Sequence, residues 1–126
     1  MAEIKIGQIV RAHYNSGKYI GEVLEDRGER FLIKVLAVQK HPMQGDLHNP
    51  GKIDGVFFHE RKALAYNEKM NVAKPAVHTF EGELPSYETS LKESVDKLKE
   101  KLTYKDTDFN NKALLTLQQL EEKHYN

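Results

Sequence analysis

The first part of the chain alternates short apolar and polar runs that glycines interrupt. IGQIVRAHY (6–14) and KYIGEVLED (18–26) are rich in β-branched and aromatic residues. The NSG between them, residues 15–17, is typical of a turn in which Gly17 can take positive φ, so the pattern predicts a β-hairpin. RFLIKVLAV (30–38) is apolar at both alternate sets of positions, and we expect both faces of this strand to be covered.

A further strand is expected at VFFHERKALAY (56–66), where Phe57 and Phe58 would point to opposite faces. The preceding residues, from Lys40 onward, show no helical or strand period and read as a long loop. Four or five short strands joined by hairpins within about 80 residues favour a small closed barrel, because closure removes exposed sheet edges.

The last third of the chain changes to a helical period. Its first apolar stripe predicts a helix over about 86–103 and consists of Leu84, Tyr87, Leu91, Val95, Leu98 and Leu102. A second stripe, capped by Asp106 or Thr107 and running to roughly His124, consists of Phe109, Ala113, Leu114, Leu117 and Leu120. The short linker between them predicts an antiparallel helical pair.

The expected fold class is therefore mainly β with C-terminal α. We expect two parts, a barrel over residues 1–80 and a helical subdomain over 81–126. Residues 1–80 hold 12 Lys and Arg against 9 Asp and Glu, and residues 81–126 hold 7 against 10. This weak charge complementarity, together with the apolar helix stripes, predicts that the helices pack on the outer face of the barrel.

Composition narrows the class of protein. The 126 residues are 39% hydrophobic and 30% charged with a formal net charge of zero, which is typical of a globular protein and unusual for a nucleic-acid binder. The chain has no cysteine, which excludes disulfides, thiolate metal sites and a cysteine nucleophile. No apolar run approaches the roughly 18 residues of a membrane span, and MAEIKIGQIVRAHY does not resemble a signal peptide. We expect a cytoplasmic protein without direct membrane insertion.

The segment KHPMQGDLHNPGKIDGVFFHER (40–61) raises the question of a metal site. His41, Asp46, His48, His59 and Glu60 are residue types that bind zinc, iron or manganese. Their spacing matches no compact ligand pattern, and the adjacent His59 and Glu60 would point to opposite faces of a strand. The simpler interpretation is an ordered loop, held by His and Asp side chains bonded to its backbone, that presents a recognition surface.

Other catalytic or binding chemistry has weaker support. No serine lies in a G-x-S-x-G context, and GKYIGE (17–22) is not a phosphate-binding loop. Tyr14 and Tyr19 flank the predicted turn and could display an aromatic binding surface, although paired tyrosines across a hairpin more often reflect simple cross-strand packing.

Five stretches of the sequence resemble one family. GKYIGEV (17–23), IKVLAVQKHPMQGDLHNP (33–50), FFHERKALA (57–65), FEGELPSYETSLK (80–92) and LLTLQQL (114–120) are similar to kinase-associated protein B of spore-forming bacteria. The resemblance implies an SH3-like barrel followed by a helical part. It also implies a non-enzymatic accessory protein, associated with a membrane sensor histidine kinase that feeds the phosphorelay controlling sporulation.

The resemblance brings no catalytic residue, cofactor or metal with it. The family is sometimes labelled a lipoprotein, but this sequence has no cysteine to carry a lipid, so membrane recruitment would come through the kinase. We expect contact with the cytoplasmic portion of the kinase through the loop and the start of the following segment, that is through His41, Asp46, His48, Phe58, His59, Glu60 and Arg61.

Two alternatives remain open at this point. One is a generic SH3-like or Tudor-like module for peptide or nucleic acid, for which the candidate basic stripe is Lys34, Lys40, Lys52, Arg61 and Lys62. The other is a metal-dependent hydrolase that uses the histidine-rich loop.

Overall fold

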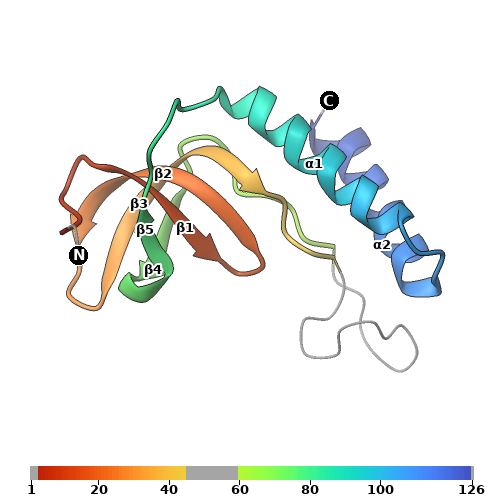
Figure 1. Cartoon of the computed structure of the whole chain (residues 1–126), viewed down its shortest axis with the longest axis horizontal. Helices are drawn as coiled ribbons and strands as arrows, with labels where there is room; N and C mark the ends of the chain where they lie inside the picture. The colour runs from red at the N-terminus through yellow and green to blue at the C-terminus, as the bar shows by residue number, and fades with distance from the viewer. Residues whose placement is uncertain (1–2, 45–59, 126) are drawn as a thin grey trace.

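A computed structural model describes residues 3–44 and 60–125 of the chain. Its elements in chain order are β1 (Ile9–Tyr14), β2 (Gly17–Asp26), β3 (Arg30–Lys40), β4 (Lys69–Ala73), a 3₁₀ turn (Lys74–Ala76), β5 (Val77–Thr79), α1 (Tyr87–Thr103), α2 (Asp108–Leu120) and a π-helical turn (Glu121–Tyr125). The strands form one antiparallel sheet, and the two helices lie together at one end of it (Figure 1). Mainly β with a C-terminal helical pair, as expected, is the observed class.

The predicted hairpin is confirmed. β1 pairs with β2 over its whole length, from Ile9 opposite Glu22 to Tyr14 opposite Gly17. The positive φ, however, belongs to Asn15 at 47° and not to Gly17, so the prediction named the wrong residue. Asparagine tolerates the left-handed region better than other side chains, which explains why the turn can close without glycine there.

The sheet is not the closed SH3-like barrel that was expected. Its strand order is β4-β3-β2-β1-β5, and β4 and β5 at the two ends are not hydrogen-bonded to each other. The 3₁₀ turn carries the chain directly from one edge to the other. β4 comes close to β1 across the curled sheet, but these short strands are too brief to form a closing ladder.

Strong curling of the sheet has a visible cause in the β2–β3 pair. Its register shifts three times, because Leu24 in β2 and Leu36 and Gln39 in β3 each stand as an extra residue without a direct partner. Such bulges increase local twist. The curled inner face then encloses the sheet core, which includes Val10, Tyr19, Val23, Ile33, Val35, Met70 and Val72.

The helices match their predicted ranges, and Thr107 caps the second helix as expected, whereas the Ser86 cap of the first helix was not predicted. Ser86 accepts a hydrogen bond from the Thr89 amide at the start of α1, and Thr107 accepts one from the Asn110 amide at the start of α2. The two helices share a core of Val95, Leu98, Leu117 and Leu120.

The expected packing of the helical part on the sheet is confirmed through α1, which packs against β3, while α2 packs on α1. Ser90 is buried at this contact. Its Oγ accepts a hydrogen bond from the Val38 amide at 3.0 Å and donates to the Tyr87 carbonyl at 2.8 Å. A small hydroxyl side chain therefore lets the helix approach the end of β3 while satisfying a strand amide that has no partner in the ladder.

The expected strand over 56–66 is wrong for the part that the structure describes. Residues 60–65 are irregular, and residues 61–65, here called the strap, run past the end of the sheet without a strand partner. β4 and β5 were not expected from the sequence. Residues 56–59, with Phe57 and Phe58, lie outside the described residues.

We predict that Gly21→Ala destabilises the fold by about 1–3 kcal/mol, because overpacking of a tight interior costs that much. A Cβ at this position would lie 2.4 Å from the Lys34 carbonyl oxygen and 2.6 Å from Ile33 Cγ2. Urea unfolding measures the effect. Glu29→Ala, at an exposed position between β2 and β3, serves as the control and should change stability by less than about 0.5 kcal/mol. Equal stability of the two variants would contradict the close approach of β2 and β3.

Candidate partner-binding surface

The structure separates the residues that the sequence grouped as a partner-binding site. His41 follows β3 directly and is fully buried, so its expected place on an exposed contact surface is wrong. Glu60 is exposed and Arg61 is half-buried. The remaining four candidates, Asp46, His48, Phe58 and His59, lie outside the described residues.

His41 has a defined hydrogen-bonding role in the interior. Its Nδ1 lies 2.9 Å from the Pro42 carbonyl oxygen and its Nε2 lies 2.8 Å from the Tyr125 hydroxyl. A carbonyl only accepts, so Nδ1 carries the hydrogen and Nε2 accepts from the Tyr125 O–H. The Tyr125 oxygen in turn accepts from the Ala63 amide at 2.9 Å. The chain of bonds fits a neutral imidazole, and burial lowers the pKa of His41 below the usual histidine value of 6.5.

The two ends that flank residues 45–59 are joined at their base. The Gln44 side chain accepts a hydrogen bond from the Arg61 amide at 2.8 Å and donates to the Arg61 carbonyl at 2.9 Å. The Met43 amide donates to Ser16 Oγ at 2.9 Å, which fixes the same base to the β1–β2 turn. Hydrogen bonds therefore hold the two described ends of the histidine-rich segment, Gln44 and Arg61, against each other and against the β1–β2 turn.

Tyrosine hydroxyls complete the hydrogen bonding of the strap. The Leu64 amide donates to the Tyr19 hydroxyl at 3.3 Å, and the Tyr87 hydroxyl donates to the Leu64 carbonyl at 2.5 Å. Burial raises the pKa of both tyrosines to about 12, so both hydroxyls keep their protons at neutral pH. Tyr19 is only 1% exposed, which excludes the aromatic display that its place beside the turn had suggested.

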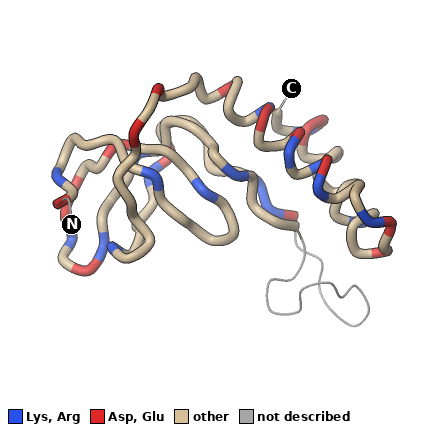
Figure 2. Tube along the Cα trace, viewed as in Figure 1, with Lys and Arg blue, Asp and Glu red and all other residues tan. Residues whose placement is uncertain are grey.

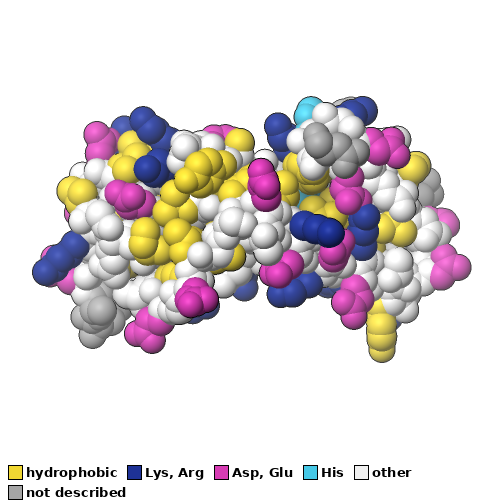
Figure 3. Space-filling model, turned by 90° about the horizontal axis from the view of Figure 1, so that it is seen from above, with side chains coloured by type: hydrophobic (Ala, Val, Ile, Leu, Met, Phe, Trp, Pro, Cys, Tyr) yellow, Lys and Arg dark blue, Asp and Glu magenta, His cyan; other side chains and the backbone are white. Residues whose placement is uncertain are grey.

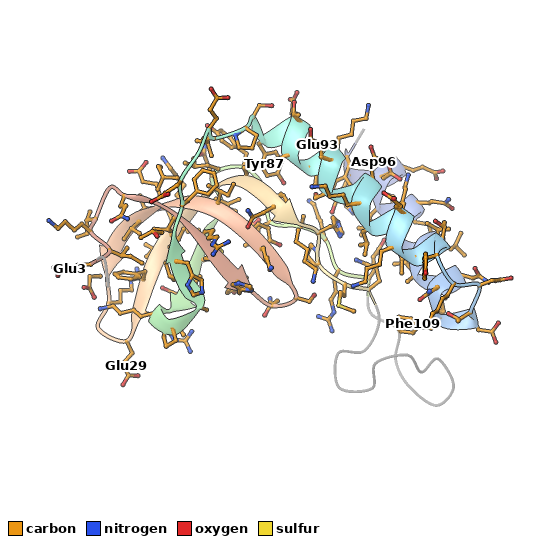
Figure 4. The ribbon with its side chains drawn as sticks, viewed as in Figure 1. Glu3, Glu29, Tyr87, Glu93, Asp96 and Phe109 are labelled. Atoms are coloured by element: carbon orange, nitrogen blue, oxygen red, sulfur yellow. The ribbon has the colours of Figure 1, made fainter. Side chains whose placement is uncertain are left out.

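An apolar groove is open beside the start of α1. It has a volume of about 590 Å³, and Ser86 and Glu88 complete a lining that otherwise consists of Leu36, Tyr66, Leu84, Pro85 and Tyr87. Tyr66 is 56% exposed and Leu84 is 45% exposed. Figure 3 shows hydrophobic side chains gathered over the half of the molecule that contains the sheet. Figure 4 labels Tyr87 where α1 meets the sheet. Exposed apolar area of this kind is typical of a surface that a partner covers.

A second hollow of about 280 Å³ lies between the helical pair and residues 43–44. Leu98, Leu102 and Phe109 contribute to its lining, and Figure 4 labels Phe109 at the start of α2. It adjoins the Gln44–Arg61 base, so apolar surface also lies next to the point where the histidine-rich segment leaves the described structure.

The described residues contain neither a metal-ligand cluster nor a membrane-spanning helix. Within residues 3–44 and 60–125, no group of three or more His, Asp or Glu side chains is placed to hold a metal ion. Asp46, His48 and His59 lie outside these ranges, so the hydrolase alternative stays untested. No helix in the same ranges is long and apolar enough to cross a membrane.

Sequence reasoning missed the residues that organise this region. Tyr125, Tyr87 and Gln44 carried no motif, and their roles depend on partners that lie far away in the chain. The one available signal was that tyrosines occupied positions of otherwise apolar stripes, where a buried hydroxyl needs a hydrogen-bond partner.

Comparison with known proteins decides the family. The family described as "Kinase associated protein B" matches residues 14–125. This chain belongs to the kinase-associated protein B family. A curated relative from Bacillus subtilis (strain 168), "Kinase-associated lipoprotein B", is 41% identical over 126 residues, which is 100% of this chain and 98% of that protein.

A solved structure supports the family fold. The crystal structure of kinase-associated protein B from Bacillus cereus is 37% identical to this chain and has a TM-score of 0.82, covering 97% of this chain and 98% of that one. The open five-stranded sheet with its C-terminal helical pair is therefore a shared architecture, and the resemblance seen in the sequence is confirmed. The family is by its description kinase-associated.

We predict that Tyr125→Phe destabilises the protein by about 1–3 kcal/mol, because it leaves the buried His41 Nε2 and the Ala63 amide without their common partner. Tyr104→Phe is the matched control, since Tyr104 is 85% exposed and should change stability by less than about 0.5 kcal/mol. Urea unfolding of the two variants checks this. Indistinguishable midpoints would show that the hydroxyl does not hold the strap.

Stability should also fall in mild acid. Because burial lowers the pKa of His41 in the folded state, the unfolded chain binds more protons between that pKa and about 6.5, and its share of stability is lost as pH falls through this range. The free energy of unfolding should decrease between about pH 7.5 and about pH 5, and less steeply in His41→Gln. An unchanged slope in His41→Gln would contradict the neutral buried imidazole.

Proposed function

We propose that this chain is a non-enzymatic accessory protein that binds the cytoplasmic portion of a sensor histidine kinase and supports its signalling into the phosphorelay that controls sporulation. The observation that carries the proposal is family membership over nearly the whole chain, together with a relative of 41% identity whose name describes it as kinase-associated. The chain would act on the cytoplasmic side of the membrane. Its 126 residues contain no cysteine that could carry a lipid, so the kinase itself would bring the protein to the membrane.

The proposed mechanism is a bias between two states of the kinase. A partner that binds one state more tightly shifts the equilibrium by its difference in affinity, and moving a kinase from mostly inactive to mostly active takes about 5.5 kcal/mol. An interface of ordinary size is large enough to provide this difference. The accessory protein needs no catalytic group for such a role.

The proposed contact surface is the histidine-rich segment with its described edge. Asp46, His48, Phe58 and His59 belong to that segment, and Glu60 and Arg61 follow it. The Gln44–Arg61 base supports this assignment, because its hydrogen bonds hold Arg61, at the described edge of the segment, in a defined place. His41 would contribute only by holding the base, since it is buried.

A pull-down of the purified cytoplasmic kinase fragment tests the function. We expect the wild-type chain to retain the fragment, and His48→Ala/His59→Ala to retain roughly tenfold less, because truncating residues that anchor an interface costs more than about 1 kcal/mol. His124→Ala is the control, as it removes an exposed histidine from another part of the molecule.

The possible outcomes test the accessory role and the location of the contact surface separately. A kinase fragment that is not retained by the wild-type chain would overturn the accessory role. Retention that survives the double histidine variant but is lost in Leu84→Ser would keep the role and move the contact to the apolar groove.

A further inference from the structure

Two rows of basic side chains cross the outer face of the sheet. The register pairs His13 of β1 with Lys18 of β2, and Lys18 with Lys40 of β3. In the adjacent row, Arg11 of β1 pairs with His78 of β5. Cross-strand partners project from the same side of a sheet, and Arg11 and His13 are two residues apart on one strand. The five side chains therefore share one face, which we call the cationic face.

This arrangement carries a cost that the fold does not require. Like charges directly opposite each other in a sheet are destabilising. Within residues 3–44 and 60–125, no ion pair offsets Arg11, Lys18 or Lys40, although ion pairs do form at other cations, namely Arg27, Lys34, Lys74 and Lys99. Three charges are thus held together in solvent without a counter-ion from the described residues.

The neighbouring cations also affect the pKa of His13. Partial burial and the positive charges of Lys18, His78, Arg11 and Lys40 lower the pKa of His13 below its usual value. The His13 and His78 rings meet edge to face with centroids 5.8 Å apart. The cluster therefore has a positive local potential even while the net charge of the chain is zero.

Concave surface adjoins both ends of the cationic face. Beside Arg11 lies a hollow of about 420 Å³, lined further by Gln39, Thr79, Phe80 and Glu81. Beside Lys40 lies a smaller hollow of about 110 Å³ that α1 completes with Lys97 and Lys101. In Figure 2 the Lys and Arg segments run across the strands and continue onto α1. The hollow beside Lys40 thus has lysines of both the sheet and the first helix in its lining.

The size of this surface indicates what it can bind. The row from β1 to β3 spans about 10 Å, the distance of two strand spacings. On β2 the same face ends at Glu22, which pairs with Lys34, and the hollow beside Arg11 ends at Glu81. A few separate carboxylates fit between these limits, whereas a nucleic-acid strand would carry its continuous phosphate charge over both glutamates.

We propose that the cationic face of Arg11, His13, Lys18, Lys40 and His78 binds an acidic segment of a protein partner. The charge complementarity and the small extent of the face support this occupant. The proposal rests on the proposed function only in taking the occupant to be a protein. It assigns a role to a sheet face that is separate from the histidine-rich segment and from the apolar groove.

An oligo-glutamate peptide is a suitable probe, and its binding to the full chain can be followed by titration calorimetry. We expect binding that weakens as salt rises from about 50 to about 200 mM, because exposed charges are screened over this range. The variant Arg11→Gln/Lys18→Gln/Lys40→Gln should bind roughly tenfold more weakly or worse. Removing mutual repulsion should leave its urea midpoint equal to or above that of the wild type.

The matched control removes the same number of charges elsewhere. Lys62→Gln/Lys69→Gln/Lys105→Gln changes three exposed lysines outside the cationic face and should keep wild-type binding. If the first triple variant does not fold, Lys18→Gln/Lys40→Gln tests the longer row alone and should still weaken binding.

Three results would overturn the proposal. They are no binding of oligo-glutamate by the wild type, equal losses in the two triple variants, and tighter binding of a single-stranded oligonucleotide of the same net charge through the same three residues. The kinase pull-down keeps the two proposals apart. Retention of the kinase fragment by a chain that ignores oligo-glutamate supports the accessory role and rejects the acidic occupant, and the reverse result rejects only the accessory role.

Discussion

The hydrogen bonds of the strap are the constraint on which the rest of this structure depends. A segment that crosses a packed surface must satisfy its backbone N–H and C=O groups, and here no strand does so. Side chains from four distant places bond it instead, namely Gln44, Tyr125, Tyr19 and Tyr87. The strap therefore holds its path only while β2, the end of β3, α1 and the last helical turn are all in place.

Through these hydrogen bonds the helical part is joined to the end of the sheet. Tyr125 ends the chain's helical region, yet its hydroxyl joins His41 after β3 to Ala63 in the strap. Ser90 adds a second link from α1 to the Val38 amide. Removing one partner of such a bond leaves the other buried polar group unsatisfied, which costs more free energy than the bond itself contributes. These few links therefore couple the two halves strongly. The apolar groove and the loop base both lie on this coupled unit.

The local sequence pattern predicts the helices and the first hairpin. It does not predict the two edge strands, β4 and β5, that complete the sheet. A stripe such as Leu91, Val95 and Leu98 specifies its own period, and Thr107 marks the start of α2. By contrast, β4 and β5 are strands of five and three residues that exist through their pairing with β3 and β1. Residues 60–65 have the composition of a strand, but their backbone groups bond to side chains and not to a neighbouring strand. His41 was grouped with the surface histidines because its partner, Tyr125, stands 84 positions away.

The same distinction applies to charge. Lys34 and Lys40 were expected in one basic stripe, but Lys34 pairs with Glu22 while Lys40 lies in another row. Lys40 meets Lys18 only because Gln39 is an extra residue in β3; without that bulge Gln39 would be the partner, and Lys18 would be the only lysine of the row. The bulges that curl the sheet around its core therefore also set the chemistry of its outer face. A sequence that counts as neutral can carry a concentrated positive surface when its register brings like charges together, and the repulsion so created is relieved by an acidic partner.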